Sequence, residues 1–442
     1  MAKFKDTYFL VFNDPSNPQG GTSFVAANGF GLLLGATGSV NFGNRTPFFH
    51  GLGDRVDPYG SSILGGDKNA LSGDTSVLVG GQDNRVIGTT WAFLGAGRNN
   101  TNCGGSSFIG AGQYNTTNAG AAWSFIGGGA GNKTWENAAT IAGGEDGDAC
   151  SYASFIGGGR ANSAGDSFTN GWYASVTAGF GNCSAAFGSH IDAGESNYNS
   201  GCWSIIAGGV CNKISGSKSC ENSIVGGSCN SINASTGNFG FFPNGMIILG
   251  GKNNSIEGYS TYSSIIGSFS SRIQTGQYNF IAASNNNRIF NLANSSVILG
   301  GTTSCIDGCN GNMCFNTIIN STNARILGTC SSLIINSPNS RICCGSFYSN
   351  IIGGQGAIIN IGHTGASLLT DGQSRAKISS GPHTLTLDFA SGIFIKNKTI
   401  LQNSYIPSDS TSPGTSGQIA TDSNYFYSHN GIKWLRTALS EW

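Results

Sequence analysis

The chain has 442 residues, a formal net charge of zero and only 10% charged residues, whereas glycine alone occupies 70 positions. A neutral chain without a basic block lacks the electrostatic footprint of a protein that binds nucleic acid or an anionic membrane. Glycine does not recur at every third residue and there are only nine prolines, which excludes collagen, and the composition fits neither a helical enzyme nor a charged disordered chain.

The first sixty residues carry no clear repeat. The run TYFLVF is followed by Asn13, Asp14 and Pro15, and it is too short for the apolar core of a signal peptide. No segment reaches the roughly 20 apolar residues of a membrane-spanning helix, so there is no sequence evidence of secretion and no membrane insertion is expected. Residues 1–60 are predicted to form two or three strands that dock the protein or cap the repeats that follow.

Residues 61–362 repeat the pattern S-x-apolar-apolar-G-G-x-x-N-x-apolar at intervals of about fifteen residues. Short periods are typical of stacked coils, in which each unit buries its apolar residues against its neighbours. Two apolar sites per repeat predict two short parallel strands and two turns, hence an all-β parallel β-roll, a β-solenoid with coils of about fifteen residues. The turns are assigned to glycines and asparagines suited to left-handed backbone or stacked amides: Gly65, Gly80, Gly95, Gly110, Asn69, Asn84 and Asn99.

Adjacent apolar residues in each repeat point to opposite faces of a strand, as Ile63 and Leu64 do. A flat roll buries only one of these faces within itself, so the other face needs a second molecule. A parallel homotrimer around one axis would cover that face and would suit a fibre with closed symmetry.

The C-terminal part of the chain is expected to differ from the repeats. Residues 363–403 alternate like ordinary strands and are interpreted as a transition region. Residues 404–442 begin with a linker rich in Ser, Thr, Pro and Gly and end in a predicted hairpin, with strands at 419–427 and 432–439 and an Asn-Gly turn between them. Small β modules are thus expected at both ends of a fibre.

Candidate catalytic or metal-binding groups are sparse. The five histidines are far apart in sequence, and Cys305, Cys309 and Cys314 lack a fourth zinc ligand nearby. The acidic segment GGEDGDAC is interpreted as a solvated turn rather than a calcium site. We therefore expect no catalytic residue, no cofactor and no metal, and we interpret most of the thirteen cysteines as free, buried thiols made in a reducing cytoplasm.

Aromatic side chains lie between the coils and near the C-terminus, where stacking on sugars is physically sensible. The alternative is that the aromatic residues between coils cover the seams between chains of an oligomer. The candidates for contact with a surface glycan or receptor are Trp172, Tyr173, Tyr425, Tyr427 and Trp434.

Two resemblances bear on these expectations. The spacing S-x-I-x-G-x-x-x-N over residues 61–362 resembles the head repeats of trimeric autotransporter adhesins, the YadA-like left-handed parallel β-roll, which implies a homotrimer that binds a host surface. The chain departs from that family because we find no secretion signal, heptad stalk or C-terminal barrel strands. The segment G-Q-I-A-x-D-x-N-Y-x-Y and the ending W-x-R-x-A-L-S-x-W resemble the ends of structural and fibre proteins of tailed phages, including cyanophages.

We therefore expect a non-enzymatic virion structural protein, a trimeric tail fibre made in the host cytoplasm. Its expected partners are its own copies, other tail or baseplate proteins, and a glycan or protein of the host surface. A bacterial cell-surface adhesin or self-assembling extracellular filament is the first alternative. A polysaccharide-degrading tailspike is the second, although acidic residues are few and none recurs at a coil interval.

Overall fold

The computed structural model describes residues 3–4, 7–13, 22–26, 55–56, 61–166, 171–216, 219–235, 244–308, 315–370, 377–389, 407–412, 419–421 and 424–438. These residues contain no helix, and so none with the length and apolar character to cross a bilayer. The chain divides into two compact units, residues 1–131 and residues 132–442.

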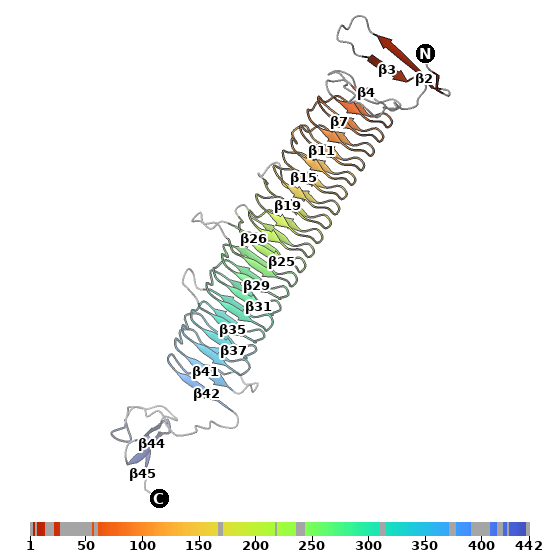
Figure 1. The fold of residues 1–442 in the computed structure, drawn as a ribbon. Helices are drawn as coiled ribbons and strands as arrows, with labels where there is room; N and C mark the ends of the chain where they lie inside the picture. The colour runs from red at the N-terminus through yellow and green to blue at the C-terminus, as the bar shows by residue number, and fades with distance from the viewer. Residues whose placement is uncertain are drawn as a thin grey trace. The chain divides into compact units, whose positions relative to one another are not determined.

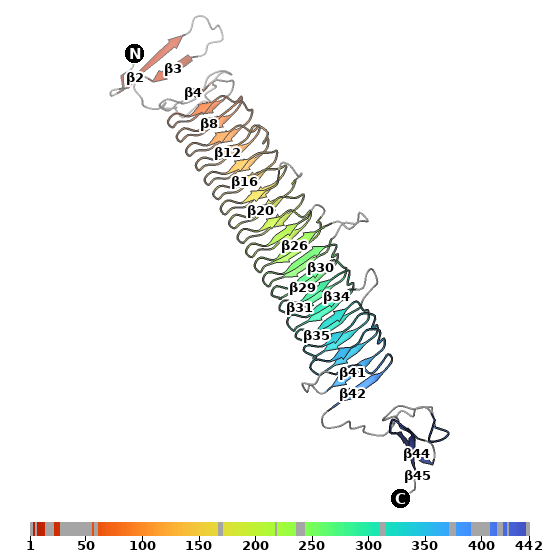
Figure 2. The same cartoon turned by 180° about the vertical axis from the view of Figure 1, so that it is seen from behind.

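Unit 1 contains two parallel sheets built from successive coils (Figures 1 and 2). The first sheet consists of β5 (Ser62–Ile63), β7 (Val77–Leu78), β9 (Phe93–Leu94), β11 (Phe108–Ile109) and β13 (Phe125–Ile126). The second sheet consists of β4 (Arg55–Val56), β6 (Ala70–Leu71), β8 (Arg85–Val86), β10 (Thr101–Asn102) and β12 (Thr116–Thr117). A separate antiparallel sheet comprises β1 (Lys3–Phe4), β2 (Thr7–Asn13) and β3 (Thr22–Ala26).

Unit 2 has the same two-sheet arrangement over more coils (Figure 1). Its first sheet consists of β15 (Thr140–Ile141), β17 (Phe155–Ile156), β19 (Ser175–Val176), β21 (His190–Ile191), β23 (Ile205–Ile206), β25 (Ser223–Val225), β27 (Ile247–Leu249), β29 (Ser264–Ile266), β31 (Phe280–Ala282), β33 (Val297–Leu299), β35 (Thr317–Ile319), β37 (Leu333–Ile335), β39 (Asn350–Ile352), β41 (Ser367–Thr370) and β42 (Leu385–Asp388). Its second sheet consists of β14 (Lys133–Thr134), β16 (Asp148–Ala149), β18 (Ser163–Ala164), β20 (Cys183–Ser184), β22 (Tyr198–Asn199), β24 (Lys213–Ser215), β26 (Ser231–Ala234), β28 (Ser255–Gly258), β30 (Arg272–Gln274), β32 (Arg288–Phe290), β34 (Cys305–Asp307), β36 (Arg325–Leu327), β38 (Arg341–Ile342) and β40 (Ile358–Ile359). An antiparallel sheet of β43 (Ile419–Thr421), β44 (Tyr425–His429) and β45 (Trp434–Ala438) follows in the chain, and its β44–β45 turn contains the Asn-Gly pair.

The prediction of an all-β parallel β-solenoid is confirmed, but the coils vary in length and their mean is longer than the predicted fifteen residues. The shortest coils do have fifteen residues, since Ser62 pairs with Val77, whereas Phe155 pairs with Ser175 twenty positions on. The mean spacing is about 17. The longest intervals add residues between a second-sheet strand and the next first-sheet strand, as between β26 and β27. Added length there leaves the paired strands in register, because the register is fixed by the inward side chains.

The solenoid also extends beyond residues 61–362. β4 pairs in parallel with β6, so the coils begin by residue 55. β41 pairs with β39 and with β42 in parallel, which places residues 367–370 and 385–388 in the same ladder rather than in ordinary strands. Leu368 of β41 is fully buried, as the inward residue of any other coil would be. The Gly-Gly turn is missing between β41 and β42, and its loss made this part of the sequence look unlike a repeat.

The interior of each unit holds stacked apolar side chains that point inward from the strands of both sheets. Ile63, Leu78 and Leu94 in unit 1, and Ile206 and Ile224 in unit 2, have no exposed surface. Burying such a side chain stabilises the fold by about 1.5–3 kcal/mol relative to leaving it in water. Parallel hydrogen bonds between coils hold the columns in register, for example from the Leu64 N–H to the Leu78 carbonyl at 3.0 Å.

A ladder of buried asparagines runs beside the apolar column. The Asn84 N–H donates to Asn69 Oδ1 at 3.1 Å, and the Asn100 N–H donates to Asn84 Oδ1 at 3.0 Å. The third ladder residue is therefore Asn100, one position after the predicted Asn99. Asn99 instead has a positive φ of 55° in the turn, because this coil is one residue longer than the coil before it.

Of the two glycines in each Gly-Gly turn, the second faces the tighter constraint. Gly66 has a φ of 112°, and a Cβ there would lie 2.3 Å from the Gly81 carbonyl oxygen, whereas a Cβ at Gly65 would meet nothing within 4 Å. The expected turn residues Gly95 and Gly110 do face the next coil closely. Glycine is thus required where the backbones of successive coils meet.

Candidate functional site

In the coils whose turn angles the structure describes, the chain enters the first-sheet strand through a residue with positive φ, two positions before the strand. We call this the corner position. In unit 2 it holds glycine in some coils, such as Gly188 with a φ of 61° and Gly245 with a φ of 68°. The same position holds exposed aromatic residues in other coils: Trp91 and Trp123 in unit 1, and Tyr173, Trp203, Tyr262, Tyr278 and Tyr348 in unit 2.

These aromatic residues are unusual on two grounds. A bulky side chain with φ near 55° is strained, and left-handed backbone costs about 1–2 kcal/mol for residues other than glycine. Their side chains are nevertheless between 49% and 68% exposed, so burial does not offset that cost within the chain. The corner position also has positive φ where it holds Thr75, Ser106 or Glu221, so the strain belongs to the turn itself. The exposure of the rings points to a role outside the chain's own core.

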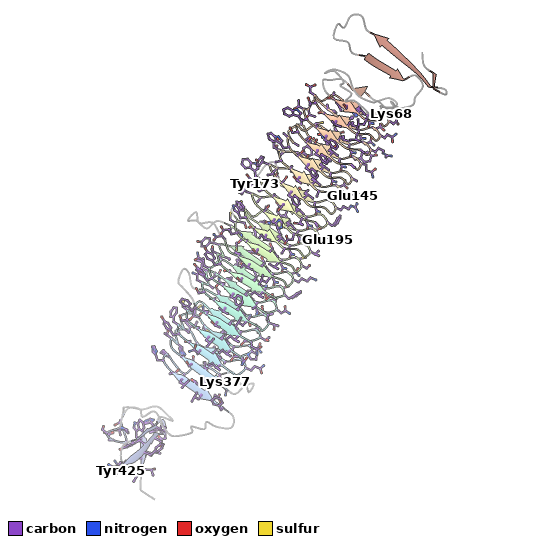
Figure 3. All side chains as sticks on the ribbon, viewed as in Figure 1. Lys68, Glu145, Tyr173, Glu195, Lys377 and Tyr425 are labelled. Atoms are coloured by element: carbon purple, nitrogen blue, oxygen red, sulfur yellow. The ribbon has the colours of Figure 1, made fainter. Side chains whose placement is uncertain are left out.

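Five of the rings in unit 2 form a continuous group, which we call the aromatic cluster: Tyr152, Trp172, Tyr173, Phe187 and Trp203. Ring centroids are 5.8 Å apart for Tyr152 and Tyr173, 5.5 Å for Tyr173 and Phe187, and 5.1 Å for Phe187 and Trp203, all edge to face. Edge-to-face pairs are favourable, so the rings hold one another in place. Figure 3 shows Tyr173 on one edge of the solenoid in unit 2, with Glu145 and Glu195 on the other.

The structure brings the predicted contact residues Trp172 and Tyr173 together in this cluster, with ring centroids of Tyr152 and Trp172 5.9 Å apart. Sequence reasoning missed Tyr152 and Phe187. Counting back from the S-x-apolar motif would have indicated the corner position, but it would not have shown which rings meet.

The other predicted contact residues lie in the β43–β45 sheet, and two of them are buried. Tyr427 and Trp434 are 7% and 4% exposed and form the small core of this sheet, so they offer no open face to a glycan. Tyr425 is half-buried, with the Arg436 guanidinium 4.5 Å from its ring centroid. A cavity of about 370 Å³ lies beside the buried pair and is lined also by Asp409.

One hydrogen-bonded constellation was not expected from the sequence. On the outward face of the first sheet, Ser175 Oγ bonds to His190 Nδ1, and His190 Nε2 lies 2.6 Å from Asp192 Oδ1. The three groups occur in the order of a hydrolytic triad. The Ser175 and Thr177 N–H groups, however, donate to carbonyls of the next coil at 2.9 Å, so they are not free to stabilise an oxyanion.

The acidic segment near residue 145 does not converge on a metal position. Glu145 Oε2 lies 3.7 Å from Arg160 Nε, and Asp148 Oδ1 accepts a hydrogen bond from Trp135 Nε1 at 3.3 Å. Among the described residues there is no group of three potential metal ligands. Cys309 and Cys314 lie outside the described residues.

The described cysteines are all free thiols, but the expectation that they are buried is wrong. Cys211, Cys229 and Cys344 are exposed and the others are half-buried, because isoleucine, alanine, asparagine and serine fill the inward positions. Partial burial raises the pKa of the Cys150 thiol to about 11, with the Asp148 carboxylate adding to the effect. A thiol with so high a pKa is a poor nucleophile at neutral pH.

Two outer surfaces of unit 2 differ sharply. The outward side chains of the first sheet form what we call the outer apolar face, and its exposed members are Phe155, Ile205, Val225, Ile247, Leu249, Leu299, Ile352, Leu385 and Leu387. The outward positions of the second sheet are mostly polar or charged, including the exposed Asn233, Arg288, Arg325 and Arg341, although Tyr198 is an exposed aromatic residue there. The run of exposed aliphatic side chains is therefore confined to the first sheet.

Comparison with known proteins identifies no relative, because no protein-family model and no curated protein matches the chain.

Proposed function

We propose that this protein is a non-enzymatic structural component of a virion tail fibre, a homotrimer that contacts the host surface. The outer apolar face is the observation that carries the proposal. Soluble monomers rarely expose contiguous apolar patches larger than a few hundred Å², and larger patches mark interaction sites. Side chains of this face recur from β23 to β42, so a partner of the same length and periodicity would cover it best.

A second copy of the chain meets that requirement. Parallel copies place the same coil at the same height, so aliphatic side chains meet aliphatic side chains along the whole face. Closed rotational symmetry then limits assembly to a discrete particle, and three copies around one axis give a fibre. The resemblance of the C-terminal segment to phage fibre proteins supports a virion rather than a cell envelope as its place.

Light scattering of the undenatured protein, with electron micrographs of the same sample, tests the assembly. A mass three times that of the 45.4 kDa chain supports the proposal. A stable monomer or an antiparallel dimer would contradict it, and open-ended filaments would favour a self-assembling filament.

A matched pair of variants tests the face itself. Leu249→Glu places a charge on the outer apolar face, and Asn233→Glu places the same charge on the outward side of the second sheet. We expect Leu249→Glu to lower the trimer fraction at micromolar concentration and Asn233→Glu to leave it unchanged. Equal behaviour of the two variants would refute the assignment of the interface.

A further inference from the structure

We propose that the aromatic cluster binds an uncharged saccharide chain by stacking pyranose rings on its exposed aromatic faces. This inference rests on the proposed function, because it names the class of host-surface ligand and the part of the fibre that holds it. It concerns Tyr152, Trp172, Tyr173, Phe187 and Trp203.

The fold does not require an aromatic ring at the corner position. Tyr173, Gly188 and Trp203 occupy the corner position of three successive coils, with φ values of 60°, 61° and 50°. Gly188 makes this turn without strain, so the coil does not need a side chain at that position. Tyrosine and tryptophan are therefore held in a conformation that glycine adopts more readily.

The arrangement of Trp203 creates a flat surface. A Cβ at Gly188 would lie 2.5 Å from indole Cε3 of Trp203, so the indole lies directly against the backbone of the preceding coil. Phe187 contacts it edge to face, and 59% of Trp203 is still exposed. A ring that is supported on one side and open to water on the other is preorganised for stacking, which lowers the entropy lost on binding.

The charges around the cluster favour an uncharged ligand. Within residues 151–166 and 171–205 the sole Lys or Arg is Arg160. Its guanidinium lies 3.7 Å from the carboxylate of Glu145, which Figure 3 places on the edge opposite Tyr173. Among the described residues of these coils, a uronic acid or sulfated sugar would find no cation beside the rings, and the next corner residue after Trp203 is the acidic Glu221. The C–H face of a neutral pyranose requires no cation.

The residue types distinguish a saccharide from a second copy of the chain. The exposed rings of the aromatic cluster are all Trp or Tyr, while the exposed large apolar residues of the outer apolar face between β23 and β42 are Ile, Leu and Val. In the proposed trimer, aliphatic side chains suffice for packing between chains. Flat rings with polar edges are suited to sugars, whose faces are apolar and whose rims carry hydroxyl groups.

The test uses the intact protein and isothermal titration calorimetry with cellohexaose, maltohexaose and laminarihexaose as neutral probes and polygalacturonate as the charged probe. Trp203→Gly and Tyr173→Gly remove a ring while relieving backbone strain. Tyr348→Gly is the matched control, because Tyr348 occupies the same corner position outside the cluster with a φ of 55°. We expect a neutral probe to bind and each cluster variant to weaken it at least about tenfold, as loss of an aromatic anchor does. Tyr348→Gly should bind within about twofold of the unchanged protein.

Light scattering and thermal unfolding of the same samples separate the outcomes. Retained trimer mass and thermal stability in the cluster variants, with binding lost, support the proposal. Loss of the trimer in Trp203→Gly would assign the rings to a seam between chains and overturn it. Binding of no neutral probe to a trimeric protein, or stronger binding of polygalacturonate, would overturn the inference and leave the fibre function standing. A monomeric protein would instead refute the fibre, while the titration would still decide whether the cluster binds sugar.

Discussion

Replacing one asparagine of the buried ladder should loosen the next coil by a measurable amount. Asn197 is 1% exposed, and its Oδ1 accepts the Asn212 backbone N–H at 3.0 Å. Its Nδ2 donates to the Gly209 carbonyl at 2.9 Å, an oxygen that also accepts the Glu195 N–H at 3.0 Å. The same Nδ2 lies 3.1 Å from Asn182 Oδ1 and 3.2 Å from the Ala193 carbonyl. Asn197→Ala therefore removes these three bonds and leaves the Asn212 N–H without its acceptor.

An unsatisfied buried donor costs about 1–3 kcal/mol. If local opening controls exchange, that cost predicts an increase of about 5- to 150-fold in the amide exchange rate at residue 212. Hydrogen exchange with mass spectrometry on a peptide spanning residues 209–214 measures it. Asn285→Ala is the control, because Asn285 is exposed in a turn and its loss should change stability by less than about 0.5 kcal/mol. An Asn197→Ala rate within twofold of the Asn285→Ala rate would refute the role assigned to the ladder.

Three further predictions follow from the coil geometry. Gly144→Ala should lower the free energy of unfolding by about 2 kcal/mol or more, because Gly144 has a φ of 101° and a Cβ there would lie 2.4 Å from the Gly159 carbonyl oxygen. Gly143→Ala is the control, since a Cβ at Gly143 meets nothing within 4 Å. Thermal unfolding of both variants measures the difference, and equal midpoints would contradict the prediction. The Cys150 thiol should react with iodoacetamide at pH 8 more slowly than the three exposed thiols, and its reaction rate should rise as the pH approaches its pKa of about 11. Peptide mapping measures the rates, and equal rates would refute the effect of burial. Cys202 and Cys220 are β-bridge partners in adjacent coils, so their Cα atoms lie about 4.8 Å apart, within the range of a disulfide. The oxidant diamide should therefore form a disulfide between them within one chain. Disulfides formed solely between chains would contradict this register.

The repeat pattern by itself determined the class of fold. A serine, two adjacent apolar residues and a Gly-Gly turn recurring at short intervals leave few structures other than stacked parallel coils, because neighbouring apolar residues need cover on both faces of a strand. The inward column that begins at Ile63 and Leu78 follows directly from that pattern. The sequence also indicated Trp172 and Tyr173 as exposed aromatic residues between coils.

The stacking of coils decided which side chains meet, because it joins residues that are far apart in the chain. Asn100 rather than Asn99 joins the ladder, since the register depends on the length of each coil. His190 reaches Ser175 because the two are register partners fifteen residues apart. The coil-to-coil register also decides which rings form the aromatic cluster and which sheet carries the outer apolar face. This register varies from fifteen to twenty-four residues, and no local sequence pattern specifies it.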